Sequence, residues 1–411
     1  MNRRSGSVFV VALVAVTILT LVAVTAASSI RADLLAAQNR LERRRAERSA
    51  QSAIQYALVA LQQVDPNVLS ESDEWNDLDG AISYQVGQST FRVQVVDMGS
   101  FINLNTAPQD QLEKLPLTTE QIESLLDWRE ADLNPRTSGA KDDFYNALDE
   151  PYNAALRRLE TVDEVLLVKD WLPATLYDPP TQTTSQPLVN AATEDQPLLA
   201  DLFTVDSASP NVNSDGEQRA DINQVQEQQL TALGISQPVA QAIIQRRNTQ
   251  GTFETMRQVL EVQGVDEEAA EALLNGVSVS SEASLPGKIN LNTASEAVLN
   301  SIPGMDSQTT NAILGQQGSF ASIGELATLG SVSIDVVRET ADYFTVGSSA
   351  FLVRAMGEDG GRRVYLEAVV VIDDTGVHLK RLQTPPFGDM RSRWGWDEEP
   401  GSDTVIVENA N

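Results

Sequence analysis

An uninterrupted apolar segment near the N-terminus constrains this chain more than any other feature. Residues 7–30 (SVFVVALVAVTILTLVAVTAASSI) contain no charged side chain, and about 20 residues of helix are enough to cross the hydrocarbon core of a bilayer. A cleaved secretory signal has a shorter apolar core, although Ala26-Ala27-Ser28 imitates its cleavage site. The sequence therefore predicts a transmembrane helix over 7–30, with a cleaved signal as the alternative.

The helical pattern continues beyond residue 30, but the composition changes from apolar to amphipathic. Leucine, isoleucine and alanine recur at helical spacing among arginines and acidic residues. We therefore predict one helix from Ser7 to about Gln62, with an apolar half and a half that packs on a domain. The arginine count alone would place the C-terminal side in the cytoplasm, but the later arginines alternate with acidic residues, so it does not settle the orientation.

A short basic leader precedes the apolar segment and ends in glycine (Arg3-Arg4-Ser5-Gly6). This arrangement resembles type IV pilins and pseudopilins, in which prepilin peptidase cuts after the glycine. The resemblance implies cleavage between Gly6 and Ser7, a single-pass inner-membrane anchor, a cytoplasmic N-terminus and a periplasmic C-terminal domain. Pilins carry glutamate at the fifth mature position, where this chain has Val11. Because a charge in lipid is costly, its absence suggests a subunit with no neighbour for that glutamate to serve.

Two groups of strands flank a mostly helical block. Alternating runs at 82–86 and 91–97 predict a hairpin, and 350–356, 363–373 and 377–382 predict three further strands. We therefore predict an α+β fold, in which the long N-terminal helix packs on a small antiparallel sheet that carries a large, mostly α-helical insertion. The expected divisions are a leader (1–6), a transmembrane helix (7–30), a pilin-like helix with the first strands (31–100), the insertion (101–345), the C-terminal strands (346–396) and a disordered acidic tail (397–411).

The insertion contains a threefold internal repeat. Two copies begin almost identically, FINLNTA at 101–107 and KINLNTA at 288–294, and a weaker copy, ADINQVQ, begins at 220. Each copy continues into a short helix, a tight turn and a second helix, which is the pattern of a helix–hairpin–helix unit. The predicted units are 101–173, 219–280 and 288–345, with a linker rich in Thr, Ser and Pro at 174–218.

The repeated motif places Asn and Thr side chains just before each first helix, where we expect them to cap it by accepting hydrogen bonds from free backbone N–H groups. The tight turn of the third copy contains a glycine. The motif residues are Asn103, Asn105, Thr106, Asn223, Asn290, Asn292, Thr293 and Gly304.

Helix–hairpin–helix units often bind DNA phosphates through the backbone N–H groups of a glycine-rich turn. In the third copy the turn is Ile302-Pro-Gly-Met-Asp306, with a carboxylate where DNA-binding relatives usually have a second glycine. The chain has a formal charge of −29, which repels phosphate backbones. We therefore expect packing units and no nucleic-acid partner. The alternatives are a membrane-anchored DNA-uptake protein and a minor pilin of a type IV pilus.

The segment after the first hairpin resembles the minor pseudopilin family called protein K of the type II, or general, secretion pathway (GspK). It reads LLDWREAD at 125–132, GAKDDFY at 139–145, PY at 151–152 and LETVDEVLLV at 159–168. The resemblance implies a non-enzymatic subunit that forms a complex with I- and J-type minor pseudopilins. Such a subunit caps the tip of the pseudopilus, initiates the fibre and supports protein export.

The protein K resemblance also implies calcium in the helical domain, because hard cations take several oxygen ligands. An acidic loop open to solvent is an alternative of equal weight. Lys141 stands where the family carries a glutamate, which removes one ligand and adds a positive charge. The candidate ligands are Asp127, Glu130, Asp132, Asp142 and Asp143.

The sequence gives no support for catalysis. It contains no cysteine and one histidine, His378, which leaves no thiolate metal site and little basis for a histidine-dependent triad. We therefore predict no catalytic residue and no cofactor other than calcium. Trp394-Gly-Trp396 near the C-terminus is a candidate partner contact.

Overall fold

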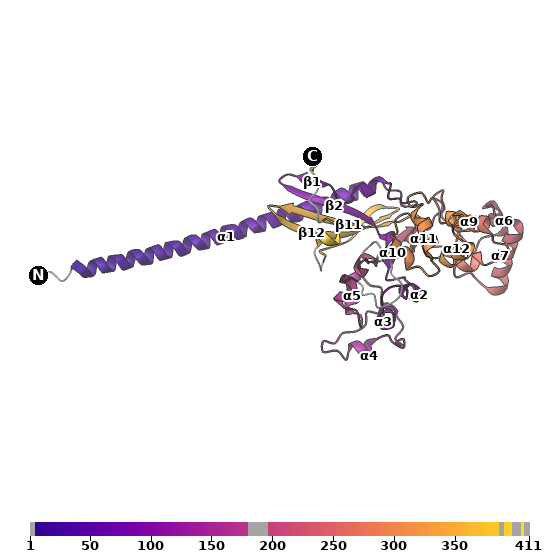
Figure 1. The fold of residues 1–411 in the computed structure, drawn as a ribbon, viewed down its shortest axis with the longest axis horizontal. Coiled ribbons are helices and arrows are strands. Elements are labelled where there is room, and N and C mark those ends of the chain that lie inside the picture. Colours follow the sequence, from indigo (N-terminus) through magenta and orange to yellow (C-terminus); the bar gives the residue numbers. More distant parts are fainter. Residues whose placement is uncertain (1–4, 180–195, 386–389, 397–403, 407–411) are drawn as a thin grey trace.

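A single long helix sets the shape of the molecule. The computed structural model describes residues 5–179, 196–385, 390–396 and 404–406. Helix α1 (Ser5–Leu61) runs unbroken for 57 residues, and its N-terminal part projects away from the rest of the protein (Figure 1). Among the described residues it alone is long and apolar enough to cross a membrane. The predicted continuous helix is confirmed, whereas residues 1–4 of the predicted leader lie outside the described residues.

The C-terminal part of α1 packs on a sheet that, in the described chain, has six strands in the order β13-β12-β11-β2-β1-β14. Neighbouring strands are antiparallel except for β1 and β14, which are parallel. The predicted hairpin and the three C-terminal strands are confirmed. The strands are β1 (Ser83–Val86), β2 (Ser89–Asp97), β11 (Ala350–Asp359), β12 (Arg362–Asp373), β13 (Gly376–Gln383) and β14 (Thr404–Ile406).

Small residues allow α1 to lie close to this sheet. Ala46, Ala50, Ala53 and Ala57 recur at helical spacing and are fully buried. Opposite them, a Cβ atom on Gly357 of β11 would lie 1.9 Å from the backbone oxygen of Ala46. The helix backbone therefore touches the strand backbone directly, with larger apolar side chains packed on either side.

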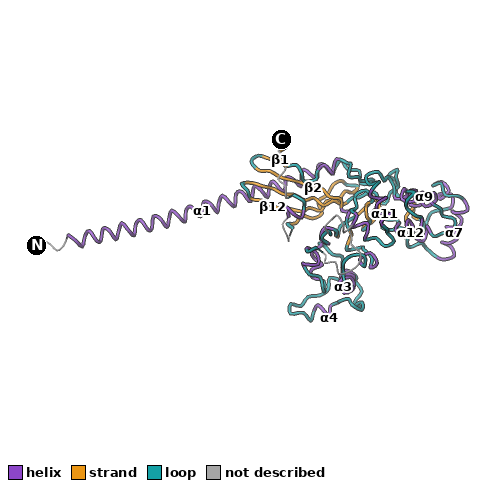
Figure 2. Tube along the Cα trace, viewed as in Figure 1, coloured by secondary structure: helices purple, strands orange, loops and turns teal. Residues whose placement is uncertain are grey.

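The helical insertion leaves the sheet at the end of β2 and returns at the start of β11, although these two strands are neighbours. Figure 1 shows the insertion at the end of the molecule opposite the N-terminus, with one arm around α3 and α4 and another around α6, α7 and α9. Figure 2 shows that loops make up much of both arms. The predicted α+β fold with a helical insertion is therefore confirmed.

Each of the three repeats is a helical hairpin closed by a short parallel ladder in the described chain. The first helices of the hairpins each bury a leucine completely, at Leu112, Leu230 and Leu299. The hairpins are α2 (Gln109–Leu112) with α3 (Thr119–Arg129), α6 (Glu227–Ala232) with α7 (Gln237–Gln250), and α10 (Glu296–Asn300) with α11 (Ser307–Leu314). The ladders are β3 (Ile102–Asn103) with β4 (Phe203–Thr204), β6 (Ala220–Asp221) with β7 (Val277–Ser278), and β9 (Ile289–Asn290) with β10 (Phe344–Thr345).

Most of the remaining elements contribute apolar residues to one continuous core of the insertion, whereas Trp75, Met98 and Met390 belong to separate clusters. Short 3-10 turns occur at Glu74–Asp77, Met98–Ser100, Val162–Leu167, Leu199–Asp201 and Ile323–Thr328. The other helices and strands are α4 (Asp142–Tyr145), α5 (Pro173–Tyr177), α8 (Met256–Leu260), α9 (Glu267–Gly276), α12 (Ile334–Thr340), α13 (Met390–Arg393), β5 (Ala208–Pro210) and β8 (Ser284–Pro286).

The segment 174–218, predicted as a linker, is partly structured. It contributes most of α5 and all of β4, and β4 closes the first hairpin unit, which therefore extends to Thr204. Leu176 is fully buried and Leu199 is 2% exposed. These apolar residues lie in a segment of mostly polar composition, so the composition predicted a linker where the structure has core residues. Residues 180–195 lie outside the described residues.

Two predictions for the C-terminus are also corrected. Thr404–Ile406, within the tail predicted to be disordered, pair with β1 as β14, and the rest of 397–411 lies outside the described residues. Trp394 and Trp396 are buried against Met356 and Met390. The two tryptophans therefore belong to the core of this chain rather than to an exposed partner contact.

Candidate functional site

The N-terminal part of α1 presents an apolar surface on all sides. Gly6 and Ser7, the predicted cleavage position, lie at the start of this helix. Val11, at the position of the pilin glutamate, is 67% exposed, and the large apolar side chains from Phe9 to Val24 are each more than half exposed. Exposed apolar area of this extent is unfavourable in water and favourable in lipid or against other apolar helices.

An asparagine side chain closes each hairpin unit in the same way. Its amide group donates to the carbonyl oxygen of a residue that follows the second helix, and its carbonyl oxygen accepts from the N–H of that same residue. Asn105 pairs with Leu159 at 3.0 and 2.7 Å, Asn223 with Phe253 at 2.9 and 2.8 Å, and Asn292 with Phe320 at 2.9 and 3.1 Å. This two-bond clamp satisfies backbone groups that burial would otherwise leave unpaired.

The motif side chains do not cap the first helices, so that prediction is wrong. Helices α2, α6 and α10 begin after Pro108, Gln226 and Ser295, which lie beyond the motif residues. The oxygen of the first motif residue instead accepts from the N–H two residues later, as Asn290 does from Asn292 at 3.0 Å. The same bond recurs at Asn103 and Asp221. These side chains therefore fold the loop rather than the helix end.

In the first two units, an arginine near the end of the second helix donates hydrogen bonds to the motif loop from the other side. Arg129 donates to the carbonyl oxygens of Leu104 and Ala107. Arg247 donates to the corresponding carbonyls of Ile222 and Val225, at 2.7 and 2.9 Å. Burial lowers the pKa of Arg129 to about 10, which still leaves the side chain charged at neutral pH. Arg247, which could be taken for a DNA contact, thus holds its own hairpin together.

In the third copy, a carboxylate of the chain itself occupies the turn where a phosphate would bind. The Asp306 side chain accepts from the Thr309 backbone N–H at 2.7 Å at the start of α11. This bond lowers the pKa of Asp306 below its usual value. Gly304 has a left-handed φ of 83°, and a Cβ there would lie 2.5 Å from the Glu339 carboxylate. Two negative groups therefore lie at this turn, which opposes phosphate binding.

Two of the five predicted calcium ligands, Asp127 in the last turn of α3 and Glu130 just after it, accept hydrogen bonds from a basic side chain of the following loop. Asp127 is fully buried, and its carboxylate accepts from the Arg136 side chain at 2.7 Å and from the Arg136 N–H at 3.0 Å. The same guanidinium donates to both oxygens of Glu130 at 2.8 and 2.9 Å. Burial by itself lowers the pKa of Arg136, but the bonds and charges of Glu130 and Asp127 outweigh it and raise that pKa above its ordinary value.

The other three predicted ligands have other hydrogen-bond partners or face solvent. Asp132 is exposed and accepts from Asn134, Asp142 accepts from the Ala154 N–H at 2.8 Å, and Asp143 is exposed. Over the residues that the structure describes, no group of three or more acidic or histidine side chains is placed to hold a metal ion. The five carboxylates predicted as ligands thus do not form one site, because each is engaged locally or faces solvent.

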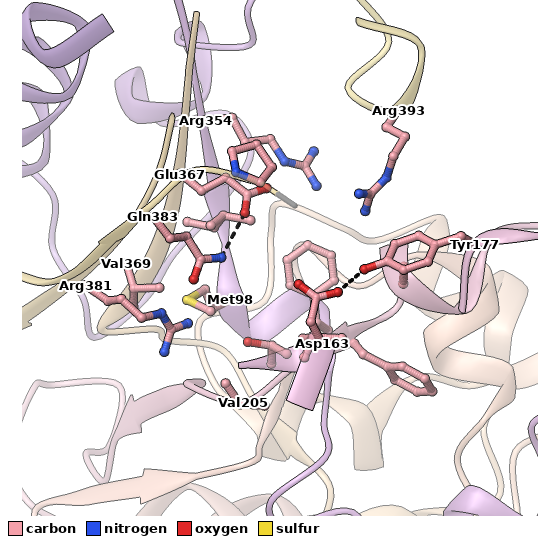
Figure 3. Close-up of a pocket in the computed structure, with 17 residues that line it drawn as sticks. Met98, Asp163, Tyr177, Val205, Arg354, Glu367, Val369, Arg381, Gln383 and Arg393 are labelled. Carbon is pink, nitrogen blue, oxygen red and sulfur yellow. Dashed lines mark hydrogen bonds between the residues drawn. The ribbon is translucent and has the colours of Figure 1, made fainter. Parts of the chain in front are cut away.

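A cavity of about 80 Å³ lies between the sheet and the first hairpin unit (Figure 3). Arg354 and Arg393 point toward it, Tyr177 donates to Asp163, and Gln383 donates to Glu367 at 3.1 Å. This volume suits a few water molecules, whereas sites for drug-sized ligands have volumes of about 300–1,000 Å³. The cavity is therefore a polar junction between two parts of the fold rather than a substrate site.

Sequence reasoning missed a second polar junction, centred on Asp97 at the end of β2. This carboxylate is 1% exposed and accepts from the Gly99 N–H at 2.7 Å, from Asn290 at 2.9 Å and from Thr293 at 2.6 Å. Burial raises the pKa of Asp97, and these hydrogen bonds, together with one to Ser348, partly offset that rise. An acidic residue at an inward-facing position of an alternating strand was the signal in the sequence.

His378 lies in an exposed part of the sheet, away from the cavity described above. Its Nε2 atom shares a hydrogen bond with Thr375 at 2.7 Å and lies 3.2 Å from the carboxylate of Asp373. Because the hydroxyl and the carboxylate both meet the same ring nitrogen, the group does not have the relay geometry of a catalytic triad.

Comparison with known proteins adds family information to this geometry. Residues 105–178 match the family model described as Type II secretion system (T2SS), protein K, and residues 216–277 match the helix-hairpin-helix motif. A chain of the GspK-GspI-GspJ complex from the enterotoxigenic Escherichia coli Type 2 Secretion System has 15% identity and a TM-score of 0.43, over 85% of this chain and 99% of that chain. No curated protein matches the chain.

The two family matches fall on segments whose local structure is now described. The protein K match begins at the first asparagine clamp and ends one residue after α5, so it covers the α2–α3 hairpin and the acidic loop that follows it. The motif match spans the second hairpin unit. Residues 105–178 are therefore similar to protein K of the type II secretion system, and residues 216–277 to the helix-hairpin-helix motif.

Proposed function

We propose that the chain is a minor pseudopilin of the protein K type, which caps the tip of the pseudopilus and initiates the fibre in complex with I- and J-type minor pseudopilins, in support of protein export. The observation that carries the proposal is the position of the helical insertion. It lies at the end of the molecule opposite the N-terminus of α1 (Figure 1). In a fibre of parallel helices, a further subunit would have to pack at that end, where the insertion would collide with it.

The surface of α1 is the one expected of a fibre subunit that resides in a membrane before it is assembled. Its N-terminal part is apolar all round, whereas its C-terminal part is fixed to the sheet by the alanine face. We propose that the helix spans the inner membrane once, with its N-terminus in the cytoplasm and the remaining domains in the periplasm. Val11 supports the tip position, because no glutamate is present there to pair with the N-terminal amine of a neighbouring subunit.

We propose a structural role without catalysis for the periplasmic part. The carboxylates of Asp97 and Asp127 accept hydrogen bonds from other residues of the chain, and Arg354 donates to Gln94. The negative formal charge and the carboxylates at the turn of Gly304 disfavour DNA uptake as the function.

Replacing Gly6 by leucine is expected to stop maturation by prepilin peptidase. The reason is that the peptidase of this family cuts after glycine, and a bulky residue would not fit there. N-terminal sequencing of the chain from membranes should give Ser7 for the wild type and an uncut start for Gly6→Leu. Ser5→Leu, one residue before, is the matched control and should still be cut. A wild-type chain that starts elsewhere would contradict the proposed maturation.

A label at Gly330 is expected to mark one end of each fibre. The chain has no cysteine, and Gly330 is exposed with open space around its Cα, so Gly330→Cys gives one labelling site with little strain. Gold particles on sheared pseudopili, viewed by electron microscopy, should appear at a single end, and the chain should co-purify with the I- and J-type subunits. Labels distributed along the fibre would rule out the cap.

A further inference from the structure

The protein K resemblance implies calcium, yet two cationic side chains already contact the end of α3, where Asp127 lies. We infer that the Lys141 ammonium and the Arg136 guanidinium take the place of a metal ion, so that the helical domain of this chain folds without calcium. The inference stands on the geometry of the loop and does not depend on the position of the protein in the fibre.

Lys141 acts at the C-terminal end of α3. Its ammonium group donates to the backbone oxygens of Asp127 and Glu130, and the residue is only 6% exposed. The last carbonyls of a helix have no partner within the helix and carry the negative end of its dipole. A cation is therefore favoured there, and in this chain a side chain supplies it.

Arg136 neutralises the carboxylates of Asp127 and Glu130 from the other side of the loop. It uses its side chain and its backbone N–H to bond both oxygens of the buried Asp127, and it forms a two-bond fork with Glu130. Calcium takes six to eight oxygen ligands. Here the oxygens nearest the helix end already accept N–H bonds, and two positive charges beside them would repel a divalent ion.

The backbone of the loop is folded tightly onto the same carboxylate. A Cβ atom on Gly139 would lie 1.9 Å from the Asp127 Oδ2 atom, so only glycine allows this approach. The Ser138 N–H donates to Glu123 at 2.5 Å, and Lys169 donates to the Ser138 oxygen at 3.1 Å. Side chains of this chain thus hold the loop at several points.

The direct test is thermal unfolding of the full chain in detergent, with excess calcium chloride, excess magnesium chloride or excess EGTA. A ligand that binds only the folded state raises the unfolding temperature. We expect the three unfolding midpoints to agree within error. A midpoint that falls by several degrees in EGTA and is restored by calcium but not by magnesium would overturn the inference.

Two substitutions test the role of Lys141 itself. Lys141→Met should lower the midpoint equally in calcium and EGTA, because it removes the internal cation while keeping the length of the side chain. Lys141→Glu should lower the midpoint in EGTA and regain stability in calcium, because it restores a carboxylate and frees the two carbonyls. Lys114→Glu, at an exposed lysine, makes the same charge change and should show neither effect.

The two variants test the inference independently, so one of them suffices if the other folds poorly. A Lys141→Met chain as stable as the wild type would show that the ammonium contributes nothing at the helix end, and it would refute the inference. A Lys141→Glu chain whose midpoint does not respond to calcium would refute the equivalence between the ammonium and a metal ion. Binding of radioactive calcium to the Lys141→Glu chain but not to the wild type supports the inference independently of unfolding.

Discussion

Replacing Gly357 by alanine is expected to destabilise the pilin-like domain by about 3 kcal/mol, at the upper end of the effects of overpacking. The added Cβ would lie 1.9 Å from the Ala46 oxygen and 2.5 Å from the Ala50 nitrogen. Both are backbone atoms of α1 and cannot rotate away. The helix would have to move off β11, which would loosen the core shared by the helix and the sheet.

Urea unfolding of the detergent-solubilised chain, followed by tryptophan fluorescence, measures this effect. Trp75 is a suitable reporter because its ring lies 5.9 Å from that of Phe351, in the core beneath α1. The matched control is Gly330→Ala, a position with open space and no left-handed φ. The control should change the free energy of unfolding by a few tenths of a kcal/mol at most. Equal stabilities for the two variants would show that α1 does not contact β11 as described.

Replacing Asp97 by alanine is expected to lower the free energy of unfolding by about 3 kcal/mol near pH 4, since buried donors left without their acceptor cost about 1–3 kcal/mol each. The substitution leaves the Asn290 amide, the Thr293 hydroxyl and the Gly99 N–H without their acceptor in a buried site. These groups join the third hairpin unit to the end of β2, so limited proteolysis should release the insertion sooner. Asp335→Ala, at an exposed carboxylate on α12, is the control.

The effect of Asp97→Ala should also depend on pH. Burial raises the pKa of Asp97, so its proton binds more tightly in the folded chain than in the unfolded chain. Its contribution to stability is therefore fully present below the unfolded pKa of about 3.9, and it is lost as the pH rises through the folded pKa. Urea unfolding from pH 4 upward, with a pH step of about one unit, should show the largest difference between wild type and variant at the acidic end. A stability difference between wild type and variant that grows with pH would contradict the raised pKa of Asp97.

The elements of the fold could be predicted because each has a local signal. An uncharged run of helical length predicts the N-terminal part of α1, and alternating residues with glycine turns predict β1, β2, β11, β12 and β13. The repeated Asn-Leu-Asn-Thr-Ala motif predicts two of the hairpins. The signal failed where local composition was misleading, as in the polar segment that contains Leu176 and Leu199, or where pairing is distant in sequence, as between β14 and β1.

The candidate site was harder to predict, because partners for buried polar groups come from distant positions. The motif asparagines were identified but given the wrong role: Asn292 closes on Phe320, 28 residues away, rather than on the next helix. The acidic loop was also identified, and Lys141 was noted as a departure from the family. Arg136, which bonds both Asp127 and Glu130, gave no signal in the sequence.

The sequence by itself determined the membrane-length helix, the strand pattern, the threefold repeat and the resemblance to protein K, because periodicity and motif spacing are local properties of the chain. Only the tertiary structure decided that Gly357 brings α1 onto the sheet, that Asp97 joins the sheet to the third hairpin, and that basic side chains fill the acidic loop. The physical reason is that a buried charge or polar group must find a partner in space, and neither composition nor spacing says which residue that partner will be.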